Sequence, residues 1–69
     1  MERTIRELRT QRKWTQVELA NRLNVTPSTV YNWEHGNWEP RAVQLRQLAT
    51  LFGVRMDEIK LLEAKKAAA

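Results

Sequence analysis

The chain contains no cysteine, a single histidine and only two glycines among its 69 residues. Without cysteine, neither a disulfide framework nor a thiolate metal site can stabilise the fold. The sequence also has no metal-ligand spacing and no glycine-rich loop of the kind that cradles a phosphate. We therefore expect no metal, no cofactor and no enzymatic activity.

Long apolar runs are missing as well. No segment approaches the roughly 20 residues of a membrane span, and the N-terminus has no apolar signal-peptide core. We expect no membrane association and a cytoplasmic, nucleoid-associated location. With 69 residues there is room for one domain and one small core. The stability must therefore come from the packing of helices, either within one chain or together with self-association.

The charge balance is positive. Twelve Lys and Arg residues against eight Asp and Glu residues give a formal net charge of +4. Such an excess favours a polyanionic partner, and nucleic acid is the first candidate. Surface charge that only keeps the protein soluble is the alternative, and composition leaves both interpretations open.

Capping boxes, in which a threonine precedes a glutamate by three positions, mark the first two helices. They begin at Thr4 and at Thr15 and predict helices to about residue 13 and to residue 23. Asn24 follows the second helix at a position that requires a left-handed backbone. Glycine is usual there, and asparagine is the tolerated second choice.

Thr26 and Pro27 mark the third helix, as an N-cap followed by proline at the first helical position. This helix is expected to run to His35 and to stop at Gly36. A fourth helix is expected from about Ala42 to the glycine at position 53.

The last apolar residues, between positions 54 and 62, predict a short fifth helix. No segment alternates as a strand would, and no hairpin turn is present. We therefore expect an all-α, compact bundle of five short helices in residues 1–63. The basic, alanine-rich tail of residues 64–69 is expected to be frayed.

The segment of residues 15–36 is typical of two short helices joined by a tight turn. Its apolar residues lock the two helices together, and the small Ala20 lets them approach closely. A unit of this kind mostly serves to hold its second helix toward the major groove of DNA.

Taken together, these marks resemble the lambda-repressor-like helix-turn-helix regulators, the Cro-type or xenobiotic-response-element family. The matching segments are Leu8-Arg9, residues 15–20 (TQVELA), Val25-Thr26, residues 30–36 (VYNWEHG), Pro40, Leu48-Ala49 and residues 52–54 (FGV). The resemblance covers about residues 3–63. It implies a five-helix DNA-binding domain that regulates transcription from a two-fold-symmetric operator. Arg41 and Arg55 stand where Ser or Thr caps are common, so we expect those two helix starts to be less well ordered.

Helical geometry sorts the residues of the third helix. Val30 and Trp33 share the buried side, and Asn32 points the opposite way. The N-terminal part of a recognition helix reaches deepest into the groove, and an asparagine amide can bond bidentately to adenine. The base-reading candidates are Pro27, Ser28, Thr29, Tyr31 and Asn32; ordinary solvent-exposed helix surface is the alternative.

Other side chains are candidates for the phosphate contacts that fix register. They are Gln16, Thr26, Asn37 and Arg41. Gln16 opens the second helix, where free backbone N–H groups favour an anion. The family resemblance implies that this glutamine bonds a phosphate and supports the recognition helix. It also implies a partly buried, structural salt bridge between Arg9 and Glu34.

One recognition helix reads only a few base pairs, so two copies are needed for useful specificity. We expect a homodimer, at least on DNA. Its contact surface is expected at Trp38, at the edge of the fourth helix, or at Leu61 and Leu62. For Trp38, packing back onto the fourth helix and stacking against the sugar-phosphate edge are the alternatives.

The leading expectation is a sequence-specific transcriptional regulator, in particular a repressor. Its partner is double-stranded DNA, and no small-molecule effector site is evident in the sequence. A protein-interaction adaptor or coactivator module with the same fold is the main alternative. An antitoxin or a controller autoregulator is also consistent with the sequence.

Overall fold

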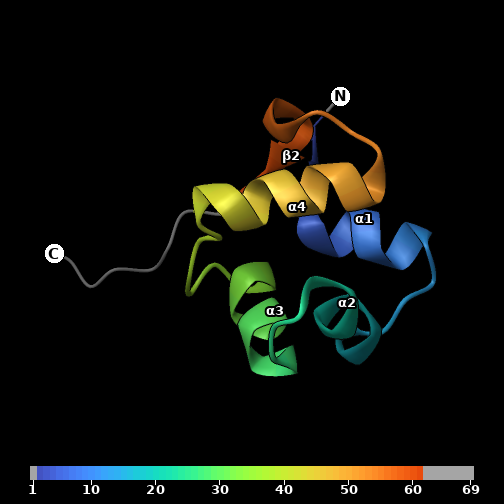
Figure 1. The fold of residues 1–69 in the computed structure, drawn as a ribbon, viewed down its shortest axis with the longest axis vertical. Helices are drawn as coiled ribbons and strands as arrows, with labels where there is room; N and C mark the ends of the chain where they lie inside the picture. The colour runs from blue at the N-terminus through green and yellow to red at the C-terminus, as the bar shows by residue number, and fades with distance from the viewer. Residues whose placement is uncertain (1, 62–69) are drawn as a thin grey trace, which may run out of the picture.

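Four short α-helices form most of the fold in the computed structural model, which describes residues 2–61 (Figure 1). The elements in chain order are β1 (Arg3–Thr4), α1 (Ile5–Gln11), α2 (Gln16–Leu23), α3 (Pro27–Glu34), α4 (Ala42–Phe52), the 3-10 helix η1 (Met56–Glu58) and β2 (Ile59–Lys60). In Figure 1, α1 and α4 lie above α2 and α3. The expectations for Leu62 and for a frayed tail of residues 64–69 concern residues outside the described range.

The helices begin where the threonine signals predict. At Thr4 and Thr15 both halves of the capping box form: each hydroxyl accepts a backbone N–H three residues on, and the glutamate at that position accepts the threonine's own N–H. α4 and η1 begin with only half of such a box. The N–H of Arg41 donates to Gln44 Oε1 at 2.9 Å, and the N–H of Arg55 donates to the glutamate three positions later. An arginine side chain cannot accept, so the other half is missing.

All four α-helices end in the same way, with a residue in the left-handed region and a hydrogen bond that closes the last turn. The left-handed residues are Lys13, Asn24, Gly36 and Gly53. The closing bonds run from the next residue's N–H back five positions, at 2.9–3.3 Å. The sequence predicted three of these positions. Lys13 gives no such signal, because a lysine rarely adopts φ near +60°.

The expected fifth helix and the expected absence of strands were both wrong for the described residues. Residues 56–58 form a 3-10 turn, and the chain then extends as β2 beside β1 in a parallel pair (Figure 1). Ile59 is buried and pairs with Arg3. A two-residue strand is too short to show alternation, and its partner lies more than 50 positions away in the sequence. The apolar spacing of this segment therefore favoured a helix.

The core draws on all four α-helices and on β2. Its buried members are Ile5, Leu8, Leu19, Ala20, Leu23, Val30, Trp33, Leu48, Ala49, Phe52 and Ile59. Ala20 is fully buried, which is consistent with the close approach of α2 and α3 that the sequence predicted. None of the helices built by residues 2–61 is long and apolar enough to cross a lipid bilayer.

Candidate nucleic-acid interface

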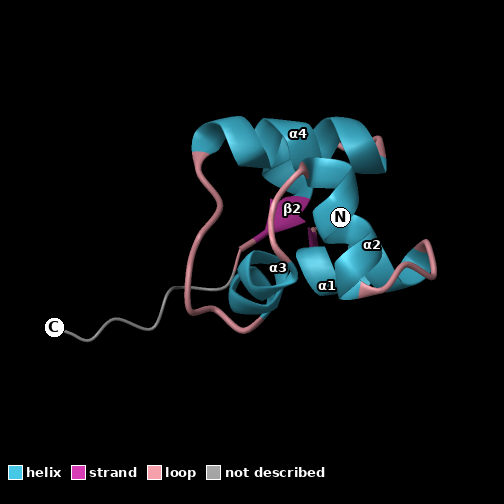
Figure 2. Ribbon diagram, turned by 60° about the horizontal axis from the view of Figure 1, so that its bottom comes forward, coloured by secondary structure: helices cyan, strands magenta, loops and turns pink. Residues whose placement is uncertain are grey.

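α3 buries one side and leaves the other in solvent. Val30 and Trp33 anchor it in the core, whereas Pro27, Ser28 and Tyr31 are exposed. Figure 2 shows α3 at the front of the molecule, with α2 on one side and the loop to α4 on the other. α3 contains no Lys or Arg. Its outer side therefore offers hydroxyl, amide and aromatic groups, while positive charge has to come from the flanking elements.

Thr29 faces the loop that leads to α4 and does not join the exposed side. Its hydroxyl lies 2.9 Å from the hydroxyl of Thr26, which also accepts the Thr29 N–H at 3.2 Å. Both side chains, which the sequence suggested as DNA contacts, therefore make hydrogen bonds within the protein. Thr29 also lines a hollow of about 340 Å³, together with Trp33, Trp38, Glu39, Arg41 and Gln44.

Tyr31 stacks on His35, with ring centroids 3.8 Å apart and planes inclined by 20°. The Nδ1 atom of His35 lies 2.9 Å from the carbonyl oxygen of Tyr31. Because a carbonyl oxygen can only accept, Nδ1 carries the proton and donates. The stack restrains the tyrosine ring on the exposed side of α3.

Asn32 is half-buried, and its side-chain amide is hydrogen-bonded at both ends. Its Nδ2 donates to the carbonyl oxygen of Ser28 at 2.8 Å, and its Oδ1 accepts from Nδ2 of Asn37 at 2.9 Å. Two residues that the sequence assigned to different tasks, base reading and phosphate contact, are thus joined. Sequence reasoning missed this pairing.

A salt bridge joins α1 to the end of α3. Arg9 Nε donates to Glu34 Oε2 at 2.6 Å and Nη2 donates to Oε1 at 3.2 Å. The Arg9 side chain is 11% exposed and that of Glu34 is 1% exposed. Nη1 of the arginine also donates to the carbonyl of Trp14 at 2.7 Å. The partly buried ion pair that the family resemblance implied is therefore present, and its carboxylate is the more deeply buried partner.

Gln16 completes this network. Its Nε2 donates to Glu34 Oε1 at 3.0 Å and so ties the first residue of α2 to the last residue of α3. The glutamine stays half-buried. Arg41 lies exposed on the other side of α3, just before α4. Two of the four phosphate candidates, Gln16 and Arg41, thus lie at the starts of α2 and α4, the helices that precede and follow α3.

The largest exposed apolar side chains near the start of α4 are Trp38, 52% exposed, and Val43, 60% exposed. Leu61 differs from them, because it packs against the core. Of the described residues considered for a dimer contact, Trp38 in the loop and Val43 at the edge of α4 therefore leave more apolar area accessible than Leu61 does.

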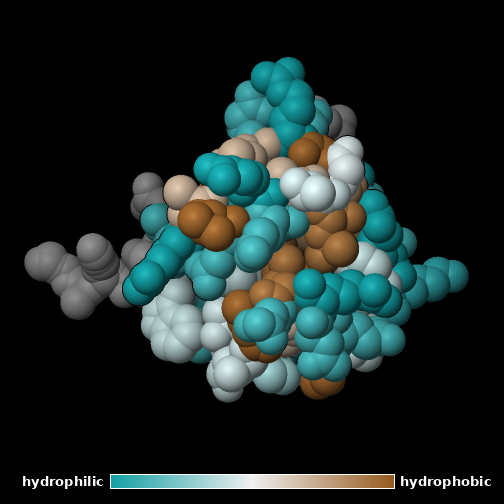
Figure 3. Space-filling model, viewed as in Figure 1, coloured by the Kyte–Doolittle hydropathy of each residue, from teal (hydrophilic) through white to brown (hydrophobic). Residues whose placement is uncertain are grey.

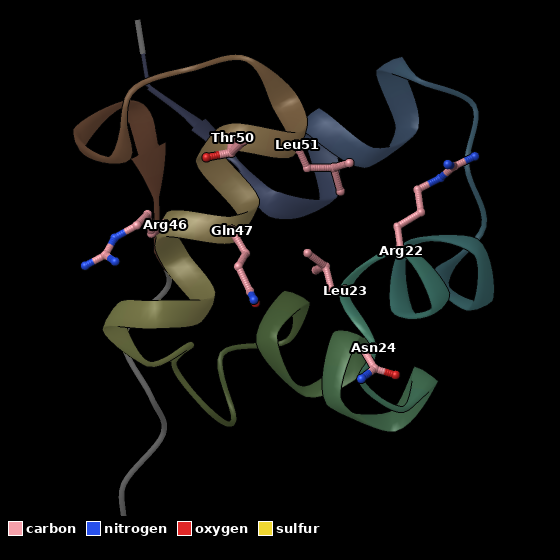
Figure 4. Close-up of a pocket in the computed structure, with 7 residues that line it drawn as sticks. All are labelled: Arg22, Leu23, Asn24, Arg46, Gln47, Thr50 and Leu51. Atoms are coloured by element: carbon pink, nitrogen blue, oxygen red, sulfur yellow. The ribbon is translucent and has the colours of Figure 1, made fainter.

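An open groove of about 420 Å³ lies between the end of α2 and α4 (Figure 4). It is lined by Arg22, Leu23, Asn24, Arg46, Gln47, Thr50 and Leu51. Figure 3 shows apolar surface near the middle of the molecule, bordered by polar side chains. Arg22 also lies over the Trp14 ring, 4.2 Å from its centroid. No sequence signal indicated this groove, since its walls come from two separate helices.

Comparison with known proteins indicates the same kind of domain as the arrangement of α2 and α3. A family model described as helix-turn-helix matches residues 5–59. A curated protein of Enterococcus faecalis, named HTH-type transcriptional activator BcrR, is 33% identical over 55 residues. The matched region is 80% of this chain and 27% of that relative, so the chain spans about a quarter of its length. No solved structure matches the chain significantly.

Proposed function

Because this chain belongs to the helix-turn-helix family, we propose that it binds double-stranded DNA and regulates transcription, with α3 placed in the major groove. The observation that carries the proposal is the way α3 is presented. Val30 and Trp33 hold one side in the core, whereas Ser28 and Tyr31 are exposed and Asn32 is half-buried. The first turn is the part of a recognition helix that reaches deepest.

Base reading is assigned to the outer side of α3. Asn32 is suited to the N6 and N7 edge of adenine, a contact that gives about 1–3 kcal/mol of discrimination. Ser28 can donate or accept, and Tyr31 adds a restrained ring that is partly exposed. Pro27 offers apolar contact only. Thr29 offers its methyl group and whatever hydrogen-bonding capacity its contact with Thr26 leaves on the hydroxyl.

Phosphate contacts are assigned to the elements on either side of α3. Gln16 opens α2, and Arg41 precedes α4. Thr26 and Asn37 were expected to share this task, and their side chains, like that of Gln16, take part in internal hydrogen bonds. The net charge of +4 supplies a general attraction to DNA. Such contacts set affinity and register without reading sequence.

We assign a dimer to the DNA-bound state. Two copies that place their α3 helices about one helical turn apart, roughly 34–36 Å, would read an inverted repeat. Trp38 and Val43 provide exposed apolar area for contact with a second copy.

For the sign of regulation we propose repression, since occupancy of an operator that overlaps a promoter is sufficient for it. The matched relative carries the name of an activator. A reporter gene placed behind the selected operator separates the two modes. Reduced expression supports repression, and increased expression assigns activation.

The test of DNA recognition is selection of duplexes from a random library at near-physiological salt, read by sequencing. We expect enrichment of an inverted repeat with half-sites about one turn apart. Asn32→Ala should change the enriched sequence, whereas Gln47→Ala, on the groove side of α4, should leave it unchanged. Binding without enrichment that fades steeply as salt rises would mean phosphate contact only. That outcome would favour the adaptor function.

A further inference from the structure

We propose that Asn37 orients the side-chain amide of Asn32 and is thereby a positioning residue for base recognition. This assignment replaces the phosphate contact that the sequence suggested for Asn37. It rests on the proposed function, because it requires α3 to read bases. The preferred base opposite Asn32 is then adenine, held by an amide whose orientation is set before DNA binds.

The end of α3 brings Asn37 back over the helix. Gly36 adopts φ +74°, and its N–H donates to the carbonyl of Trp33 at 3.3 Å. The N–H of Asn37 then donates to the carbonyl of Asn32 at 2.9 Å. These two bonds form the helix-ending motif that reverses the chain after a left-handed residue. Consequently the Asn37 side chain lies beside that of Asn32, although five positions separate them.

The hydrogen bonds around Asn32 permit only one orientation of its amide. The carbonyl oxygen of Ser28 has no hydrogen to give, so the atom of Asn32 that faces it must be the nitrogen. The oxygen of Asn32 must then face Asn37, which has to present a donor. Reversing either amide would set two acceptors or two donors against each other. A backbone carbonyl therefore removes the ambiguity that asparagine orientation usually carries.

Enough bonding capacity remains on Asn32 to read a base. An amide nitrogen has two N–H groups and an amide oxygen has two lone pairs. One of each is used within the protein, so one donor and one acceptor remain. Adenine presents an acceptor at N7 and a donor at N6, which is the complementary pair. Because Asn37 already restrains the amide, less ordering is required when DNA binds.

A phosphate role for Asn37 predicts a different behaviour. Loss of a phosphate contact weakens binding to all sequences alike, since phosphates carry no base information. Loss of a positioning residue lowers discrimination at a single base pair. The two roles can therefore be separated by comparing operators that differ only at the position read by Asn32.

The experiment measures Kd for the selected operator and for three operators altered at that base pair. The wild type should discriminate by about 5- to 150-fold, the ratio that corresponds to a good bidentate contact. Asn37→Ala should reduce this ratio at least threefold, with the ratios at the other positions unchanged. Asn37→Asp should reduce it further, because it sets an acceptor against Asn32 Oδ1. Equal weakening on all four operators, with the ratio intact, would overturn the proposal and restore the phosphate role.

Two further measurements show whether Asn37 acts through Asn32. In the Asn32→Ala background, Asn37→Ala should leave the ratio unchanged; a further loss of similar size would contradict the proposal. In the free protein, Asn37→Ala should shift the side-chain NH₂ resonances of Asn32, and unchanged resonances would also overturn it. Failure of the wild type to select any sequence would refute the proposed function itself, before any variant is compared. A thermal melt of each variant separates these effects from unfolding.

Discussion

Replacing Arg9 by alanine should destabilise the domain by about 3–5 kcal/mol, the cost typical of leaving one partner of a buried ion pair alone. The arginine donates three hydrogen bonds, two to Glu34 and one to the carbonyl of Trp14. After its removal the Glu34 carboxylate, whose side chain is 1% exposed, keeps only the bond from Gln16 among its contacts within residues 2–61. A carboxylate so poorly compensated cannot recover its lost hydration without opening the contact between α1 and α3.

This predicted loss is large in relation to the domain's total free energy of unfolding. A chain of 69 residues is expected to have a free energy of unfolding of about 3–10 kcal/mol. Arg9→Ala therefore removes between roughly a third and all of it. Urea denaturation followed by circular dichroism would measure the change. The double variant Arg9→Met, Glu34→Leu should recover most of the loss, because an apolar pair of similar size avoids the buried charge.

The chain offers a matched control in a second arginine pair. Arg55 bonds Asp57 at 2.9 Å, and these side chains are 78% and 67% exposed. Solvent screens an exposed pair, so Arg55→Ala should cost at most about 1 kcal/mol. If Arg9→Ala proved no more harmful than Arg55→Ala, the argument from burial would be refuted.

Three other predictions concern the helix end, the acid response and the dimer. Lys13→Gly should stabilise the domain by about 1 kcal/mol, because glycine adopts the left-handed backbone at φ +60° without the strain that a side chain brings; a melting temperature at or below that of the wild type would contradict this. A hydrogen bond from the Arg55 backbone N–H holds the pKa of Glu58 below its ordinary 4.5. The stabilisation from this carboxylate is therefore complete above pH 4.5 and is lost as the pH falls through the lowered pKa; Glu58→Gln should remove that part of the acid response, and identical acid titrations of the two proteins would refute the assignment. Trp38→Ser with Val43→Ser should weaken binding to an inverted repeat more than to a single half-site, as measured by gel shift; equal weakening would assign these residues to DNA and not to the dimer.

Much of the candidate site could be predicted from the sequence, because its signals are local. Thr15, Asn24 and Pro27 act on backbone groups within a few positions of themselves, so each signal and its target are read together. They predicted both ends of α2 and the start of α3. The alternation of buried and exposed positions along α3 then followed from helical periodicity. The base and phosphate assignments stay predictions until DNA binding is measured.

Sequence reasoning missed two contacts, and both form between residues that come together only when the rest of the chain packs. Ile59 is a strand residue because the core brings it beside Arg3. The spacing of apolar residues within one segment gives no information about a partner near the other end of the sequence. Asn37 reaches Asn32 only after Gly36 reverses the chain.

By itself, then, the sequence determined where α2, α3 and α4 begin and end, to within a residue, and which residues of α3 face the core. Those properties depend on caps and on periodicity, whose parts are neighbours along the chain. Only the tertiary structure decided that the last apolar segment is a strand, that a groove opens between α2 and α4, and which groups the Asn32 amide faces. These outcomes depend on the relative placement of whole elements, which follows from the simultaneous packing of one shared core.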